Sequence, residues 1–111
     1  MTDPNDLLPL PAASFHILIS LGDQDRHGYA ILRDVSERTG GAFARGPATL
    51  YTNIKRLLSN ELIEESGERP IVDDERRRYY RLTPFGRQVA AAELHRLQST
   101  VRQAKALFAR S

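Results

Sequence analysis

Arg45-Gly-Pro-Ala-Thr-Leu-Tyr-Thr-Asn-Ile-Lys-Arg-Leu-Leu-Ser-Asn60 is the stretch of sequence that decides the fold of this chain. Pro47 is favoured at the first position of a helix, so it predicts a helix start. Four apolar residues then recur at helical spacing and form an inward face, namely Leu50, Ile54, Leu57 and Leu58. The outer face carries bases and small polar groups but no acid. The stretch therefore predicts an amphipathic helix over residues 47–60 with a cationic outer face.

A β-hairpin is predicted directly after this helix. Residues 61–66 are short enough for one strand, and residues 77–82 alternate as a second strand inside the arginine-rich segment Arg76-Arg-Arg-Tyr-Tyr-Arg-Leu-Thr83. The polar residues 67–76 between them, with a proline and an acidic centre, form a long hairpin tip. Two cationic elements that lie so close in the sequence predict one surface for a polyanion.

Helices are also predicted on both sides of this central region. Apolar residues recur at steps of three and four over residues 10–21, and Phe15, Leu18 and Ile19 lie off that stripe. Such a helix is covered by more than one neighbour, one of which we expect to be a partner chain. A second helix is predicted over residues 28–39, with Phe43 filling the core after it. Thr83 and Pro84 supply a cap and a first-turn proline for a last helix that reaches about Ala109.

The last helix contains an apolar seam at steps of four and three residues. Its members are Ala90, Leu94, Leu97, Val101, Ala104 and Phe108. This repeat of 3.5 residues is the one that a coiled coil needs, although a helix packed on its own domain is the alternative. The predicted dimer surface comprises Phe15, Leu18, Leu94, Leu97, Val101, Ala104 and Phe108.

The predicted fold class is mainly α with a small β-hairpin. Helix, helix, helix, hairpin and long helix is the order of a winged helix-turn-helix with a long C-terminal dimerisation helix. We expect residues 1–9 to be a flexible N-terminal tail, residues 10–83 the winged helix-turn-helix domain, and residues 84–111 the dimerisation helix.

Composition narrows the class of protein further. The chain has no cysteine, no apolar run long enough to cross a membrane and no basic N-terminal signal, so we expect a cytoplasmic protein with no membrane partner. The net charge of +2 hides a polarised distribution, because residues 1–44 hold three bases against six acids while residues 45–60 hold no acid. Local charge rather than the overall pI therefore favours a nucleic acid.

In a winged helix-turn-helix the third helix enters the major groove of DNA and the wing touches the backbone. The DNA-binding candidates are Arg45, Ala48, Thr49, Tyr51, Thr52, Asn53, Lys55 and Arg56 around the helix and Arg76, Arg77 and Arg78 in the wing. Asn53 can bind adenine and Arg56 guanine through two hydrogen bonds each. Lys55, Arg45 and the Tyr51 hydroxyl suit phosphate, as do the unpaired amides of the helix N-terminus.

Other interpretations stay open. Residues 47–60 could be an ordinary solvated helix, and the wing arginines could pair with Asp73, Asp74 and Glu75. A winged helix that docks a protein, or one that binds RNA, would show the same order of elements. An enzyme is disfavoured, since His16, His27 and His95 fall on three separate elements and the chain lacks a phosphate-binding glycine loop. We expect no catalytic residue, no metal and no cofactor.

The sequence resembles the PadR family of bacterial transcriptional regulators over roughly residues 10–90. The matching segments are His27-Gly-Tyr29, Gly46-Pro-Ala-Thr-Leu-Tyr51, Lys55-Arg-Leu-Leu58, Glu61-Leu-Ile63 and Arg78-Tyr-Tyr-Arg-Leu-Thr83, with Gly86 after them. The resemblance implies a homodimeric repressor that binds double-stranded DNA at a palindromic operator and that, as in several members, is released by a small aromatic or drug-like effector. It also implies that Thr49, Tyr51 and Lys55 contact the operator.

This chain departs from the family pattern in three ways. Ala48 stands where glycine is frequent, a change that leaves the helix start intact. The C-terminal part is a single short helix, which argues against an elaborate effector pocket, and no tryptophan is present to form the aromatic sandwich of some drug-binding members.

Overall fold

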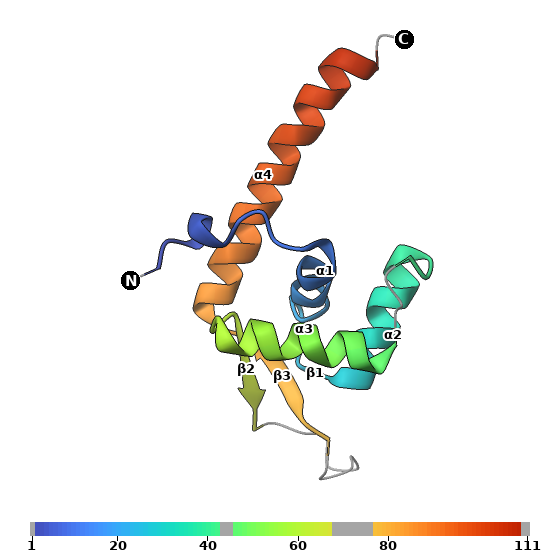
Figure 1. Cartoon of the computed structure of the whole chain (residues 1–111), viewed down its shortest axis with the longest axis vertical. Coiled ribbons are helices and arrows are strands. Elements are labelled where there is room, and N and C mark those ends of the chain that lie inside the picture. Colours follow the sequence, from blue (N-terminus) through green and yellow to red (C-terminus); the bar gives the residue numbers. More distant parts are fainter. Residues whose placement is uncertain (1, 43–45, 68–76, 110–111) are drawn as a thin grey trace.

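Helices dominate the computed structural model, which describes residues 2–42, 46–67 and 77–109 (Figure 1). In chain order the elements are the 3-10 helix η1 (Pro4–Leu7), α1 (Ala12–Ser20), β1 (Arg26–His27), α2 (Gly28–Thr39), α3 (Pro47–Ser59), β2 (Ile63–Ser66), β3 (Tyr79–Leu82) and α4 (Pro84–Phe108). The predicted order of three helices, a hairpin and a long helix is confirmed.

Two short elements were not predicted. Residues 1–9 were expected to be a flexible tail, but Pro4–Leu7 form η1, which packs against α4, and Leu7 and Leu8 pack on the hydrophobic core. The two-residue strand β1 pairs antiparallel with β3, so the sheet has three strands in the order β1-β3-β2. Neither element is long enough to show a hydrophobic period in the sequence.

One hydrophobic core joins the helices to the hairpin. Its buried members are Ile17, Leu18, Leu21, Ile31, Val35, Leu50, Ile54, Leu57, Leu62, Ile63, Tyr80 and Val89. Leu18 is only 1% exposed within its own chain, so we remove it from the predicted dimer surface. Of the three apolar residues of α1 that lie off its main stripe, only Leu18 is buried within its own molecule, whereas Phe15 and Ile19 are partly exposed.

The hairpin is fixed by a short antiparallel ladder. Ile63 lies opposite Leu82 and Glu65 opposite Tyr80. Tyr79, which the alternation of the strand would place on the outer side, is nevertheless 9% exposed, because its ring packs edge-on against His27 with 5.3 Å between the ring centroids. The added strand β1 therefore pairs with the other edge of β3, and its His27 covers the Tyr79 ring.

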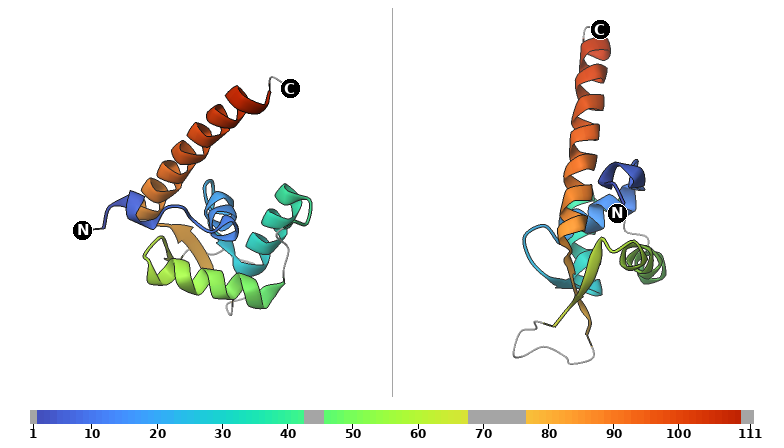
Figure 2. Two further views of the ribbon diagram at one scale, coloured as in Figure 1. Left: turned by 45° about the horizontal axis from the view of Figure 1, so that its top comes forward. Right: turned by 90° about the vertical axis from the view of Figure 1, so that its left-hand side faces the viewer.

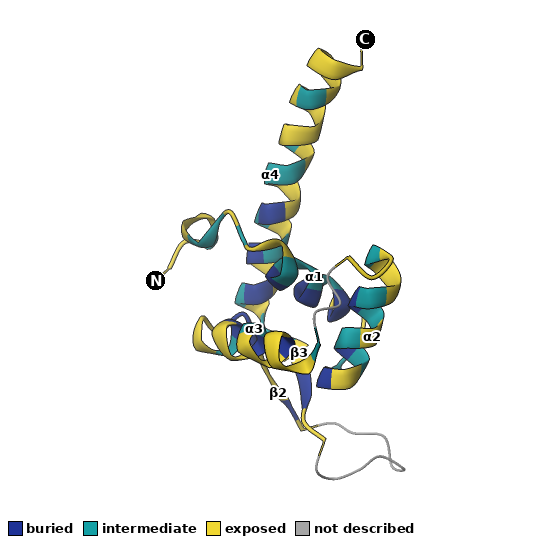
Figure 3. Ribbon diagram, turned by 45° about the vertical axis from the view of Figure 1, so that its right-hand side comes forward, coloured by how far each residue is buried: buried dark blue, intermediate teal, exposed yellow. Residues whose placement is uncertain are grey.

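Helix α4 starts in the core and then leaves it. Its N-cap residue Thr83 accepts a hydrogen bond from the Gly86 amide at 2.8 Å and donates one to the Glu61 carbonyl at 2.7 Å. Beyond Glu93 most of the helix is exposed and projects away from α3 and the hairpin, as Figure 2 shows from two further directions and Figure 3 shows by burial. In the described part of the chain, no helix is long and apolar enough to cross a membrane.

Candidate nucleic-acid interface

The start of α3 is open to an anion. Gly46 is the N-cap and takes a φ of 92°, a conformation that L-residues rarely adopt, and it offers no side chain to the first amides. Pro47 stands at the first helical position, as the sequence predicted. Among the described residues no side chain caps the amides at this N-terminus, and the helix dipole makes the end partly positive. A phosphate oxygen can accept hydrogen bonds from these amides, and its negative charge is favoured at the positive end of the helix.

The outer face of α3 presents the cationic surface that the sequence predicted. Leu50, Ile54 and Leu57 are buried, which turns the opposite side of the helix to solvent. The exposed side chains there include those of Ala48, Thr49, Tyr51, Thr52, Lys55 and Arg56. Neither Lys55 nor Arg56 forms an ion pair with any acid in the described ranges, so both charges are available to a partner.

The structure gives Asn53 a different position from the one predicted. Its side chain lies at the contact between α3 and α1, half-buried, where its Oδ1 accepts from the Ser14 hydroxyl at 3.2 Å and its Nδ2 donates to the Thr49 carbonyl at 3.0 Å. A bidentate contact to adenine needs both of these atoms. In this structure these contacts position α3 against α1, and the base-reading role of Asn53 stays a prediction.

Tyr51 is held against the start of α2. A Cβ atom on Gly28 would lie 2.7 Å from the Tyr51 hydroxyl oxygen, so only glycine lets this side chain lie there. Tyr51 remains 49% exposed, and its hydroxyl is thus placed at the surface between α2 and α3. The neighbouring Tyr80 has a raised phenol pKa, because of burial first and then the nearby Glu65 and Tyr51. The sequence marked this contact only through the segment His27-Gly-Tyr29, whose role it did not reveal.

The wing arginines of the described chain are already engaged in part. Arg78 forms an ion pair with Glu65 at 3.0 Å, and Arg81 forms one with Glu64 at 3.0 Å. These pairs are exposed and therefore weak, so a phosphate can replace the carboxylate. Arg77 is exposed and contacts the ring of His27 at 3.1 Å. Predictions for Arg45, Arg76, Phe43 and residues 73–75 lie outside the described residues.

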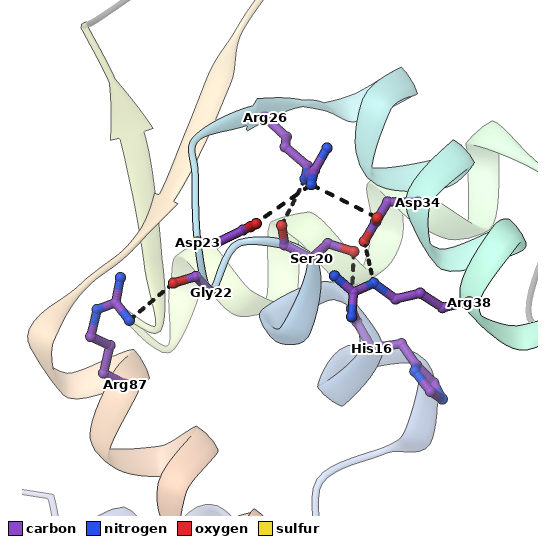
Figure 4. Close-up of polar contacts among 8 residues, drawn as sticks. All are labelled: His16, Ser20, Gly22, Asp23, Arg26, Asp34, Arg38 and Arg87. Carbon is purple, nitrogen blue, oxygen red and sulfur yellow. Dashed lines mark hydrogen bonds and ion pairs between the residues drawn. The ribbon is translucent and has the colours of Figure 1, made fainter.

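A polar network that the sequence did not predict holds β1 against α1 and α2 (Figure 4). Arg26 donates from Nε to the Ser20 carbonyl at 2.8 Å and lies 3.8 Å from carboxylate oxygens of Asp23 and Asp34. Asp34 also accepts from Arg38 at 2.7 Å. Partial burial alone would raise the pKa of Asp34, but the hydrogen bonds from Ser20 and Arg38 and the charge of Arg26 outweigh it and lower the pKa.

The seam of α4 remains largely uncovered within one molecule. Leu94, Val101 and Phe108 are 51%, 50% and 73% exposed, and Leu97 and Ala104 are partly exposed. Phe15 on α1 is also only partly buried. The remaining residues of the predicted dimer surface are therefore accessible to a partner.

Comparison with known proteins places this arrangement among transcription regulators. Residues 17–92 match the model of the Transcriptional regulator PadR-like family. A transcriptional regulator from Mycobacterium tuberculosis is 30% identical over 92 residues, which are 83% of this chain and 81% of that protein. An uncharacterised protein from Lysinibacillus sphaericus is 39% identical over 72 residues, and this chain spans 64% of its length.

Solved structures agree with the fold. A PadR family transcription regulator from Clostridium difficile matches with a TM-score of 0.75 and 25% identity, over 86% of this chain and 96% of that chain. RosR from H. salinarum matches with a TM-score of 0.71 and 30% identity, over 86% and 80%. Bacillus subtilis PadR, solved in complex with operator DNA, shares the fold with a TM-score of 0.64 and 23% identity, over 78% and 48%.

Proposed function

This chain belongs to the PadR-like family of transcriptional regulators, and on that premise we propose that it binds double-stranded DNA in a sequence-specific manner through α3 and the wing. Such a regulator works in the cytoplasm, where bacterial DNA lies. The observation that carries the proposal is the acid-free outer face of α3, which presents Lys55 and Arg56 on a helix whose N-terminus has no side-chain cap among the described residues.

In this proposal each exposed group of α3 has its own task. Arg56 and Thr52 face base edges in the major groove, where arginine recognises guanine and threonine contacts a base or a thymine methyl. Lys55, the Tyr51 hydroxyl and the amides at the start of α3 hold backbone phosphates and fix the position of the helix. Arg77 and Arg78 extend the phosphate contacts along the wing.

We propose that two copies bind together as a repressor. The uncovered seam of α4, continued by Phe15, supports a homodimer, because a row of exposed apolar side chains at this spacing suits a second helix. A two-fold dimer would place its α3 helices in successive major grooves about 34 Å apart on a palindromic operator, where it blocks transcription.

Release by a small aromatic effector is part of the same proposal. The apolar cavity between α1, α2 and α3, which Ile17, Val35 and Leu50 help to line, measures about 30 Å³ and is too small for an aromatic ring. The effector would therefore bind outside this cavity.

Selection of bound sites from random DNA tests the DNA-binding part. We expect a palindrome whose affinity falls steeply as the salt concentration rises, because several phosphates are neutralised. Arg56→Ala should relax the preference at one base position of each half-site, whereas Lys55→Ala should weaken binding to all sequences alike. A recovered pool without a common sequence, together with a shallow salt slope, would instead support a winged helix that docks a protein.

Sedimentation tests the dimer. Leu97→Glu places a charge in the centre of the seam and should give monomers, because a buried unpaired carboxylate is unfavourable. Gln103→Glu adds the same charge at an exposed position on the face of α4 opposite the seam and should leave the dimer intact. A Leu97→Glu variant that sediments as a dimer would refute the assignment of the seam.

A further inference from the structure

Two small side chains, those of Ala48 and Thr52, lie one turn apart on the exposed face of α3. At about 100° per residue, both lie on the side of the helix opposite the buried stripe of Leu50, Ile54 and Leu57. They are therefore the part of α3 that lies farthest from the core. When α3 enters a groove of DNA, these two side chains reach deepest toward the bases.

The hydroxyl of Thr52 is already bonded within the helix. It donates its hydrogen to the Ala48 carbonyl at 3.0 Å. A hydroxyl has one hydrogen, so this bond leaves Thr52 no donor for the acceptors of guanine or thymine. The side chain still presents its methyl group and the lone pairs of its oxygen, which can accept from the amino group of adenine or cytosine.

The neighbouring side chains decide between these two possibilities. Ala48 has only a methyl group, so the surface beside Thr52 is apolar. Lys55 and Arg56 lie on the two sides of this surface, and both are donors only. An amino group of adenine or cytosine would bring one more donor to these cations. Thymine instead brings a methyl group to the apolar surface and the acceptor O4 to the cations.

We propose that Ala48 and Thr52 contact the 5-methyl group of a thymine in each half-site, an inference that rests on the proposed function and assigns a base to these two residues. Thr52 recognises this base through its methyl group, while its hydroxyl stays bonded to the Ala48 carbonyl. The 5-methyl group distinguishes thymine from adenine, guanine and cytosine in the major groove. The contact is therefore specific although it contains no hydrogen bond from Thr52.

Replacement of thymine by uracil tests the contact on the DNA side, because uracil lacks only the methyl group. Each thymine of the selected site is replaced in turn, and the affinity is measured by fluorescence anisotropy. At one thymine of each half-site we expect a loss of about fourfold, and of about 15-fold when both half-sites are changed, since one buried methyl group is removed at each. Because this scan leaves the protein unchanged, it stays decisive whatever a substitution does to α3.

Thr52→Val and Thr52→Ser are a matched pair on the protein side. Valine keeps the methyl group and loses the hydroxyl, so Thr52→Val should bind like the wild type and keep the preference for thymine over uracil. Serine keeps the hydroxyl and loses the methyl group, so Thr52→Ser should lose about fourfold per half-site with thymine and little more with uracil. Ala48→Gly should also lose more affinity with thymine than with uracil.

The possible failures of these experiments are distinct. If the wild type binds a palindrome and no uracil replacement weakens it, the methyl contact is refuted and the DNA-binding function stands. If Thr52→Val loses affinity while Thr52→Ser binds like the wild type, the hydroxyl recognises the base and the proposal is wrong. If the wild type binds no DNA or selects no common sequence, the proposed function itself fails.

Discussion

Gly86→Ala should destabilise the fold strongly, although it adds a single methyl group. Gly86 is buried in the first turn of α4, and a Cβ atom there would lie 1.9 Å from the Leu62 carbonyl oxygen and 2.8 Å from the carbonyl carbon. A Cβ atom and a carbonyl oxygen need a separation of more than 3.0 Å, so the start of α4 and the backbone of Leu62 must move apart by over an ångström. The Leu62 carbonyl also accepts from the Thr83 amide at 3.1 Å, which ties it to the start of the same helix.

The expected loss in the free energy of unfolding is about 3 kcal/mol, at the upper end for overpacking, because the obstacle is backbone rather than a side chain that can rotate. An unfolding entropy of about 2.1 cal/mol/K per residue gives roughly 0.23 kcal/mol/K for a chain of 111 residues. The melting temperature should therefore fall by about 13 °C.

Urea and thermal unfolding followed by circular dichroism measure this effect. Gly67→Ala is the matched control, because a Cβ atom there meets nothing within 4 Å and the residue has no positive φ. We expect it to change the free energy of unfolding by less than about 1 kcal/mol. Equal stability of Gly86→Ala and Gly67→Ala would show that the approach of α4 to Leu62 does not constrain the fold.

Three further variants test the polar contacts. The pKa of Asp34 is lowered in the folded state, so the carboxylate stabilises the fold above its ordinary pKa of 3.8. This stabilisation is lost as the pH falls through the pKa of the folded state. Asp34→Asn should therefore lower the free energy of unfolding at pH 7 and make it depend less on acid pH, as measured by urea unfolding. Glu93 is 1% exposed, accepts from the Leu10 amide at 2.7 Å and pairs with Arg96. Glu93→Leu should lower the free energy of unfolding by about 2 kcal/mol, and Glu93→Gln, which keeps an acceptor, should lower it clearly less. Equal losses in the two variants would contradict this reasoning. Asn53→Ala should cost about 1 kcal/mol and weaken binding to all DNA sites alike in gel-shift assays, whereas a change at one base position would confirm its role as a base reader.

The sequence alone determined the four α-helices, the β2–β3 hairpin and the cationic face of α3, because their signals are local. Pro47 starts α3, Gly40 takes a left-handed conformation at the end of α2, and the Thr83 side chain caps α4 by accepting from the Gly86 amide three residues on. The apolar stripe of α3 and its acid-free outer face also follow from helical spacing. The winged helix-turn-helix order could therefore be predicted without any tertiary contact.

The tertiary structure alone decided which of the candidate side chains are available for binding. Asn53 is hydrogen-bonded to Ser14, Leu18 is buried in the core, and Arg78 pairs with Glu65. Each of these contacts joins segments that are far apart in the sequence, so residue type and periodicity do not specify them. Leu18 shows the reason, since a helix with apolar residues on two sides can meet a partner chain or its own core, and only the packing of the other elements determines which.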